Sequence, residues 1–364
     1  MKKIFLTVIA LLTVASASVF GMYGVDTDWI FFLTHGNQFR ARLDQLGFTL
    51  GNDTIKGTFG FDNNTSFGGT YGAMLHHQSG DFYNFVPSIS MGIGYTSSAI
   101  GIGVGYSATI SSNRDTKNNG KTVTRSAHTP VLVLNAMDNA FRMAIPIQVY
   151  VNNDKGDGWK RNITAVSVDS QFRYYSGLEM LPQIRLYLRY GNYSKDENGT
   201  KDKAESFGFD LRFYFGSVVE EVALQPLVKL AYNGAIGKQH NFARVQAVNA
   251  MNGAYDNPSI RYGTGVWNLT LMTGLGLTAN SDIVSLYLEP QLGLKVDQAG
   301  SATDKNVKET YGLGYNVYAE IYITPIKNLE WYFEAEIQDA LKTTSPAGFN
   351  FNGTTGVTWY LPAL

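Results

Sequence analysis

The sequence predicts an all-β fold: a closed antiparallel transmembrane β-barrel of about 16 strands, with 14 as the other count that the pattern allows. Apolar residues alternate with polar ones over segments of strand length. The connections between these segments are short and long in turn, as in barrels with short periplasmic turns and long extracellular loops. An export signal precedes the first segment.

Residues 1–21 have the pattern of a secretory signal peptide. Lys2 and Lys3 precede the apolar run IFLTVIALLTVASASVF, which is short for a membrane-spanning helix and ends in small residues. Cleavage after Ala17 and cleavage after Gly21 both fit. The signal predicts export, and together with the alternation it predicts a location in the cell outer membrane.

The mature chain is expected to divide into two parts. Residues 22–38 (MYGVDTDWIFFLTHGNQ) fit no strand, and we expect them in the lumen or along the periplasmic rim. Residues 39–364 are expected to form the barrel. Whether the N-terminal segment plugs the lumen stays open at this point.

The alternation is clearest over residues 88–110 (SISMGIGYTSSAIGIGVGYSATI). Successive side chains of a strand point to opposite faces, so each half of this hairpin has one apolar and one polar face. A soluble sandwich or lipocalin-like barrel would need the apolar face inside. A sheet of so many strands cannot fill its interior with side chains, so we expect the apolar face to meet lipid and the polar face to line the lumen.

Sixteen segments are expected to be strands: 40–50, 55–61, 69–77, 84–96, 99–110, 130–137, 140–151, 162–174, 183–192, 205–216, 222–233, 264–278, 283–296, 311–323, 329–341 and 355–363. The first three are the weaker candidates; the hairpin over 45–61 is convincing, whereas 62–83 is not. Long polar loops are expected at 111–130, 152–161, 191–204, 233–261, 297–310 and 342–354.

The run Gly101-Ile102-Gly103-Val104-Gly105 superficially resembles a dinucleotide-binding fingerprint. It lies within a predicted strand, lacks the fingerprint's spacing and opens no helix, so it predicts no nucleotide site. Close strand packing or space in the lumen accounts better for these glycines.

Charged residues on the polar faces are expected to line the lumen. They form a basic set from the middle of the chain and an acidic set from near its end: Arg142, Arg173, Arg185, Arg189, Arg212, Lys229, Glu289, Glu320, Glu330, Glu334 and Glu336. Such charges would set the ion selectivity of a hydrated channel. Alternatively, they pair with neighbours or with residues 22–38 and fill a closed interior.

Composition excludes several classes of function. The chain has 29 basic and 30 acidic residues, which argues against nucleic-acid binding. It contains no cysteine, so it has no thiolate nucleophile or Cys-ligated metal. The five histidines form no recognisable catalytic set, and we expect neither an enzyme nor a cofactor.

The stretch FLTHGNQFRARLDQLGF, residues 32–48, resembles the start of the mature Brachyspira variable surface proteins, outer-membrane proteins of intestinal spirochaetes. The resemblance implies a surface-exposed variable antigen and favours Met22 as the mature start. It brings no catalytic or binding residues. The chain departs from usual barrels by ending in Leu364 instead of an aromatic residue.

Three functions fit these expectations: an antigen with polar extracellular loops, a porin-like channel for ions and small polar solutes, and an adhesin acting through loop 233–261. The expected partners are outer-membrane lipid, the outer-membrane assembly machinery, and host antibodies or host surface contacted by the loops. A homo-oligomer is also compatible with the sequence.

Overall fold

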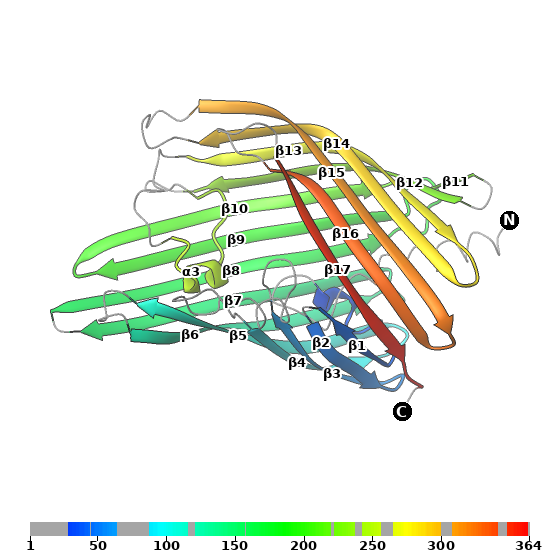
Figure 1. Ribbon diagram of the computed structural model, residues 1–364, viewed down its shortest axis with the longest axis horizontal. Helices are drawn as coiled ribbons and strands as arrows, with labels where there is room; N and C mark the ends of the chain where they lie inside the picture. Colours follow the sequence, from blue (N-terminus) through cyan, green and yellow to red (C-terminus); the bar gives the residue numbers. More distant parts are fainter. Residues whose placement is uncertain are drawn as a thin grey trace.

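The computed structural model describes residues 28–43, 45–63, 87–115, 121–156, 158–219, 222–236, 242–255, 265–299, 308–340 and 348–362. The predicted signal peptide, 1–21, and the strand expected at 69–77 lie outside these residues. The described part of the chain is almost entirely antiparallel sheet (Figure 1). Among the described residues, no helix is long and apolar enough to cross a membrane.

The sheet closes on itself, because the first strand pairs with both the second and the last. The strands are β1 (Gln38–Arg42), β2 (Gln45–Gly51), β3 (Ile55–Asn63), β4 (Pro87–Thr96), β5 (Ile100–Asp115), β6 (Lys121–Ala136), β7 (Phe141–Gly156), β8 (Trp159–Tyr175), β9 (Gln183–Glu197), β10 (Thr200–Tyr214), β11 (Ser217–Val219), β12 (Val222–Ala235), β13 (Trp267–Asn280), β14 (Val284–Ala299), β15 (Lys308–Ile326), β16 (Leu329–Ala340) and β17 (Gly348–Tyr360).

The described chain therefore forms a barrel of sixteen strands. The short β11 continues β10 along the same neighbour, since Tyr214 pairs with Leu227 and Ser217 pairs with Leu224 of β12. Both count as one strand. This confirms the predicted closed antiparallel barrel and the larger of the two strand counts.

One predicted strand, 40–50, is wrong and is two strands in the structure. β1 and β2 form a tight hairpin in which Phe39 pairs with Phe48. The physical reason is a change of parity: inward-facing Arg40 and Arg42 lie at even positions, whereas inward-facing Gly47 and Thr49 lie at odd positions. A single strand with period two cannot place all four residues on one face.

The two faces of the barrel wall have opposite polarity, as expected. On β4 and β5, Ile93 and Ile102 are exposed on the outside, while Ser90 and Ser107 are buried on the inside. Backbone groups within lipid have no water to bond, and a closed barrel satisfies all of them between strands. The alternation is thus explained by lipid outside and a polar lumen inside.

An arginine on the outer face should be costly near mid-membrane. Val104, the fifth residue of β5, points outward and is exposed. We expect Val104→Arg to lower the free energy of unfolding in lipid by about 2–4 kcal/mol, because a cation must enter hydrocarbon. Denaturant titration in bilayers measures this. The control is Val151→Arg at the eleventh residue of β7, where the expected cost falls to about 0–1 kcal/mol. Equal losses at both positions would contradict the predicted membrane placement.

Three predicted long loops are wrong, because strands continue into them, and residues 348–354 of the predicted loop 342–354 likewise belong to β17. Segments 111–130, 152–161 and 191–204 belong to the hairpins β5–β6, β7–β8 and β9–β10, whose strands are 15 to 17 residues long. A membrane-spanning strand needs only about 9–11 residues. These strands are therefore longer than a membrane span requires, and Figure 1 draws β7 to β10 as long ribbons.

Charge pairing between neighbouring strands holds these extensions together. Asp154 bonds Arg125 at 2.8 Å and Arg161 at 3.0 Å. At the tip of β9–β10, Asn198 and Gly199 have φ angles of 52° and 86°. An Asn-Gly pair is the strongest short-range signal for a tight hairpin, so this turn was readable in the sequence.

The ion pair at Asp154 predicts a pH effect in the β7–β8 hairpin. Burial raises the pKa of Asp154, but hydrogen bonds from Arg125 and Arg161 outweigh it, so the pKa lies below its ordinary value of 3.8. A carboxyl group whose pKa is lower in the folded state than in the unfolded state stabilises the fold at pH values above its unfolded-state pKa. This stabilisation is lost as the pH falls through the folded-state pKa. We expect Asp154→Asn to cost at most about 1 kcal/mol of unfolding free energy near neutral pH, since solvent screens the pair.

The difference between wild type and Asp154→Asn should stay constant above about pH 4 and shrink below it. Denaturant titrations at several pH values measure this. The neighbouring exposed Lys155→Gln serves as a control without this dependence. If the stability difference between wild type and Asp154→Asn grew on acidification, the stabilising role of the Asp154 ion pairs would be contradicted.

Candidate functional site: the barrel lumen

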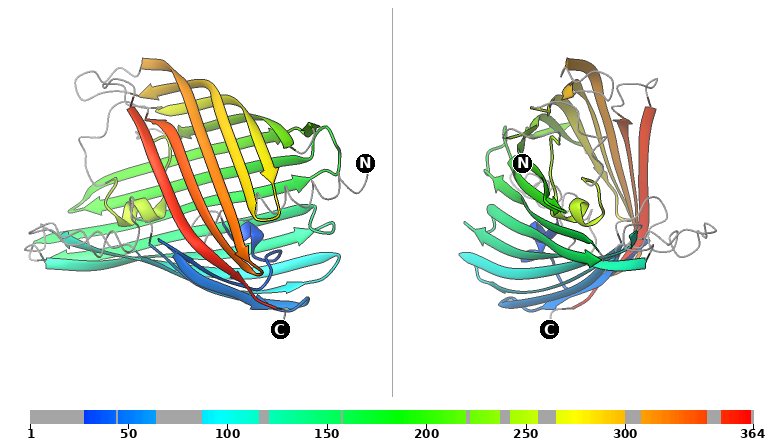
Figure 2. Two further views of the ribbon diagram at one scale, coloured as in Figure 1. Left: turned by 45° about the vertical axis from the view of Figure 1, so that its right-hand side comes forward. Right: turned by 90° about the vertical axis from the view of Figure 1, so that its left-hand side faces the viewer.

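The described part of the N-terminal segment, from residue 28 onward, lies inside the barrel. The 3-10 helix η1 (Asp28–Phe31) and the following turn run along the inner wall (Figures 1 and 2). The five residues from Trp29 to Leu33 are at most 3% exposed. A wholly apolar run is thus buried within a lumen whose wall is otherwise mostly polar.

Inner-face glycines make room for this segment. A Cβ built on Gly92 would lie 2.6 Å from a ring carbon of Trp29, and one on Gly103 would lie 3.2 Å from Leu33. Gly105 faces the same tryptophan ring. The glycine-rich wall of β4 and β5 is therefore the docking surface of η1, and small apolar residues of β6 and β7 extend it: Val131, Val133 and Ala144. Space in the lumen was one of the two reasons expected for these glycines.

Polar contacts fix the C-terminal end of the segment. Arg142 of β7 donates a hydrogen bond to the hydroxyl of Thr34 at 3.3 Å. The Asn37 side-chain amide donates to the carbonyl oxygens of Gly51 at 2.8 Å and Pro362 at 2.7 Å. The segment is therefore tied to the wall and to both ends of the barrel sequence.

A second segment, residues 242–255, also lies inside. It contains the short helix α3 (Ala247–Met251), which contacts β6, β7, β8 and β9 and is seen within the barrel in Figure 2. The prediction that 233–261 is an outward loop is therefore wrong for its described part. The physical reason is a matching apolar patch on the inner wall, whose members are Ala127, Tyr150, Ile163, Ala165, Tyr193 and Ala204.

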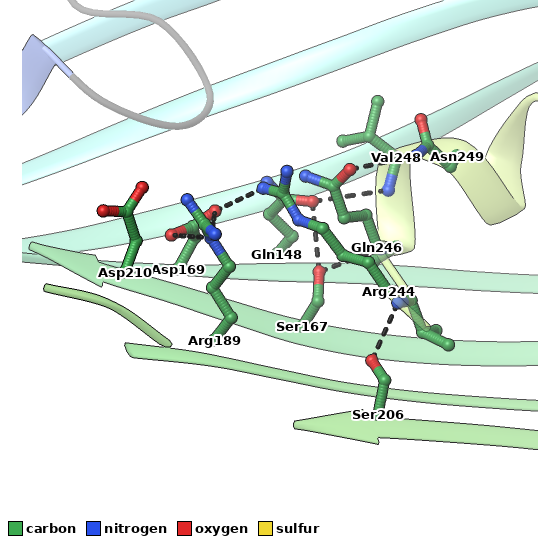
Figure 3. A network of polar contacts seen from close by, with 12 residues as sticks. Gln148, Ser167, Asp169, Arg189, Ser206, Asp210, Arg244, Gln246, Val248 and Asn249 are labelled. Atoms are coloured by element: carbon green, nitrogen blue, oxygen red, sulfur yellow. Dashed lines mark hydrogen bonds and ion pairs between the residues drawn. The ribbon is translucent and has the colours of Figure 1, made fainter. Parts of the chain in front are cut away.

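Backbone donors of the second segment bond inner-wall side chains (Figure 3). The amide of Val245 donates to Ser206 Oγ at 2.8 Å, and that of Ala247 donates to Ser167 Oγ at 2.9 Å. Arg244 pairs with Asp169 of β8. These bonds satisfy a segment that would otherwise bury unpaired backbone groups. The inserted segment narrows the lumen between β6 and β10.

The predicted basic residues lie on one continuous wall. Direct cross-strand pairing links Arg142, Arg173, Arg185, Arg212 and Lys229 in a single row over β7, β8, β9, β10 and β12. We call these five residues the basic row. The sixth predicted cation, Arg189, lies on β9 and pairs with Asp169 at 3.3 Å. Only part of this row has carboxylate partners, because Asp210 pairs with Arg212 at 2.8 Å and Lys229 at 3.8 Å.

The predicted acidic residues lie on β14, β15 and β16, and each has a polar partner. Four of them accept hydrogen bonds from neighbouring side chains: Glu289 from Gln291 at 2.6 Å, Glu320 from Tyr322 at 2.7 Å, Glu330 from Tyr360 at 3.1 Å and Glu336 from Asn316 at 2.6 Å. Glu334 pairs with Arg42 of β1 at 3.5 Å. We call Glu330, Glu334 and Glu336 of β16 the acidic strip.

Basic row and acidic strip lie on different walls. In the strand order of the closed sheet, β16 is eight places from β7 and four places from β12, in a circumference of sixteen strands. Solvent reaches both sets: the side chains of Arg212 and Lys229 are 22% exposed and that of Glu334 is 18% exposed. An electric field across the lumen follows from this separation of charge.

Sequence reasoning missed several lumen charges. Asp169 and Asp210 were not on the predicted list, although each lies at an inward position of its strand. Arg40 and Arg42 of β1 were missed because 40–50 was read as one strand with a single face. Both arginines are buried on the inner face.

Among the described residues, no three His, Asp or Glu side chains form a group able to hold a metal ion. The residues brought together here are cations, carboxylates, tyrosines and amides on a barrel wall. This arrangement suits the attraction and orientation of polar solutes.

A polar interior, an apolar exterior and a closed strand order define a transmembrane β-barrel of outer-membrane type. The sequence model of the Serpulina hyodysenteriae variable surface protein matches residues 2–257 and 240–360. The chain belongs to this family of variable surface proteins, which confirms the resemblance noted in residues 32–48. No curated protein matches the chain.

Solved barrels resemble the structure at low sequence identity. A bacterial polysaccharide outer membrane secretin has a TM-score of 0.49 and 10% identity, over 87% of this chain and 91% of that one. The loop L8 deletion mutant of OmpT from Vibrio cholerae has a TM-score of 0.36 and 10% identity, over 89% and 97%. The translocator domain of autotransporter NalP from Neisseria meningitidis has a TM-score of 0.31 and 14% identity, over 90% and 89%. The fold assignment rests on strand pairing and not on these scores.

Proposed function

We propose that this protein is a surface antigen of the outer membrane and that the hairpins β5–β6, β7–β8 and β9–β10 present its exposed surface. The observation that supports this is the length of their strands, 15 to 17 residues, against the roughly 9–11 needed to span. Polar, charge-paired tips suit contact with water and with host antibodies.

Epitope insertion tests this proposal. A short peptide tag placed between Asn198 and Gly199, at the tip of β9–β10, should bind antibody on intact cells. The same tag in the short turn between β13 and β14, at Asp282, should bind only after the membrane is permeabilised. The reverse pattern, or a tag silent at both sites in intact cells, would refute the proposal.

The second candidate function is a narrow pore for ions and small polar solutes. Its support is the exposure of Arg212, Lys229 and Glu334, which stay open to solvent inside the barrel beside the two inserted segments. In liposomes the protein should admit a monosaccharide faster than a trisaccharide, because η1 and residues 242–255 narrow the passage. Swelling no faster than in protein-free liposomes would exclude the pore.

We do not extend the proposal to adhesion by loop 233–261. Residues 242–255 of that loop pack against the inner wall, so the part of the loop that the structure describes offers less support for adhesion than the projecting hairpins do.

A further inference from the structure

Three arginines of the basic row stand directly opposite one another near the short-turn end of the barrel. Arg142 is the second residue of β7, Arg173 is the third from the end of β8, and Arg185 is the third residue of β9. Cross-strand pairing places Arg142 beside Arg173 and Arg173 beside Arg185. Like charges directly opposite on one face repel, so this arginine triad needs a compensating partner.

No carboxylate of the described residues pairs with the triad. Arg142 donates to the backbone oxygen of Asn139 at 3.1 Å and to Thr34, and Arg185 donates to the amide oxygen of Gln183 at 3.0 Å. By contrast, Arg189 and Arg212 each pair with an aspartate. The triad therefore carries a net positive charge. The charges of its neighbours Arg189 on β9 and Arg212 on β10 are, in contrast, neutralised by aspartates.

Arg173, at the centre of the triad, has unused donors. It is 4% exposed, and its Nε and Nη1 have no hydrogen-bond partner among the described residues. The amide nitrogens of Gln171 and Gln183, on the same inner faces of β8 and β9, are likewise buried without a described partner. Buried donors without acceptors are costly, and several of them together favour an acceptor with more than one oxygen.

Aromatic rings hold the guanidinium groups in place. The centre of the Arg173 guanidinium lies 4.3 Å from the ring centroid of Phe31 in the N-terminal segment, and that of Arg185 lies 4.4 Å from the ring of Tyr214. Stacking orients the planar guanidinium groups and leaves their N–H edges free to bind. Arg185 is half-buried, so the triad can be reached from the lumen.

We propose that the arginine triad binds a small oxyanion, a phosphate or a carboxylate, at the periplasmic end of the lumen. Both groups present paired oxygens that match the guanidinium fork. The negative charge of the anion reduces the repulsion between the three arginines. Its oxygens accept hydrogen bonds from Nε and Nη1 of Arg173. This site does not depend on the proposed pore or antigen role, because binding from the periplasmic side requires no passage through the barrel.

Titration calorimetry of the refolded full-length protein tests the site. Inorganic phosphate and succinate are titrated separately at constant ionic strength, with chloride as the competing anion. Wild type should bind at least one of these two anions. The anion that binds more tightly shows whether the site takes a phosphate or a carboxylate. Arg173→Gln should weaken that binding about tenfold or more, because charge-assisted hydrogen bonds are lost. Lys155→Gln, which removes a cation from the exposed β7–β8 tip, should leave it unchanged.

Arg185→Gln keeps the test valid if Arg173→Gln fails to fold, since Arg185 is less buried. The tighter-binding anion should also raise the midpoint of thermal unfolding in wild type but not in either arginine variant. The proposal is overturned if wild type binds neither anion more tightly than chloride. It is equally overturned if Arg185→Gln folds and binds as wild type does.

Discussion

Replacing Gly105 with leucine should displace the N-terminal segment from the lumen. The new side chain would occupy the space of the Trp29 ring, which faces Gly105 and Gly92. Forcing a large side chain into such a contact typically costs about 1–3 kcal/mol. We therefore expect a loss of this size in the free energy of unfolding, measured by denaturant titration. The freed lumen should also conduct more current in a planar bilayer.

A matched substitution separates this effect from the general cost of leucine in a strand. A Cβ on Gly57 of β3 would meet no atom nearer than 3.9 Å, so Gly57→Leu should change stability and conductance little. Combining Gly105→Leu with Trp29→Ala should recover part of the lost stability, because the alanine leaves space for the leucine. If Gly105→Leu were as mild as Gly57→Leu, docking of the segment on the glycine wall would be contradicted.

Neutralising the acidic strip should shift ion selectivity toward anions. The triple change of Glu330, Glu334 and Glu336 to glutamine removes three carboxylates from one wall and leaves the basic row intact. A change of 1 kT in lumen potential alters the ratio of cations to anions by about sevenfold, so we expect a several-fold shift. The reversal potential in a salt gradient measures it.

The control for this shift carries the same charge change outside the lumen. Glu179 lies in a short turn, Glu205 on the outer face of β10, and Glu309 at the exposed start of β15. Changing these three to glutamine should move the reversal potential much less. Equal shifts in both triple variants would mean that the acidic strip does not face the ion path.

The fold was predictable because lipid imposes one simple pattern. The alternation of residues 88–110 predicts β4 and β5 and their two faces, and the structure agrees. The pattern failed where it is locally ambiguous. A parity change separates β1 from β2, and polar residues on both faces of β5–β10 beyond the membrane look like loops although charge pairs hold them in strands.

The lumen was predictable only in part. Each inward charge follows from strand parity, so the basic and acidic sets were found on neighbouring strands. Register is a tertiary property, and no local signal places Arg142 beside Arg173. The lumen was one of the two places expected for residues 22–38, but the docking sites of both inserted segments were beyond prediction for the same reason. Trp29 needs the glycines of β4 and β5, and Val245 needs Ser206 of β10, far away in the sequence.

Planar-bilayer recording of the purified, refolded protein tests the central claim most directly: that the lumen of this barrel is a narrow, charge-lined passage. Discrete and stable current steps are expected in wild type, with a reversal potential that moves in the acidic-strip variant. Protein that is folded and inserted but passes no current would contradict the claim. Its lumen would then be closed, and its function would lie on the projecting hairpins.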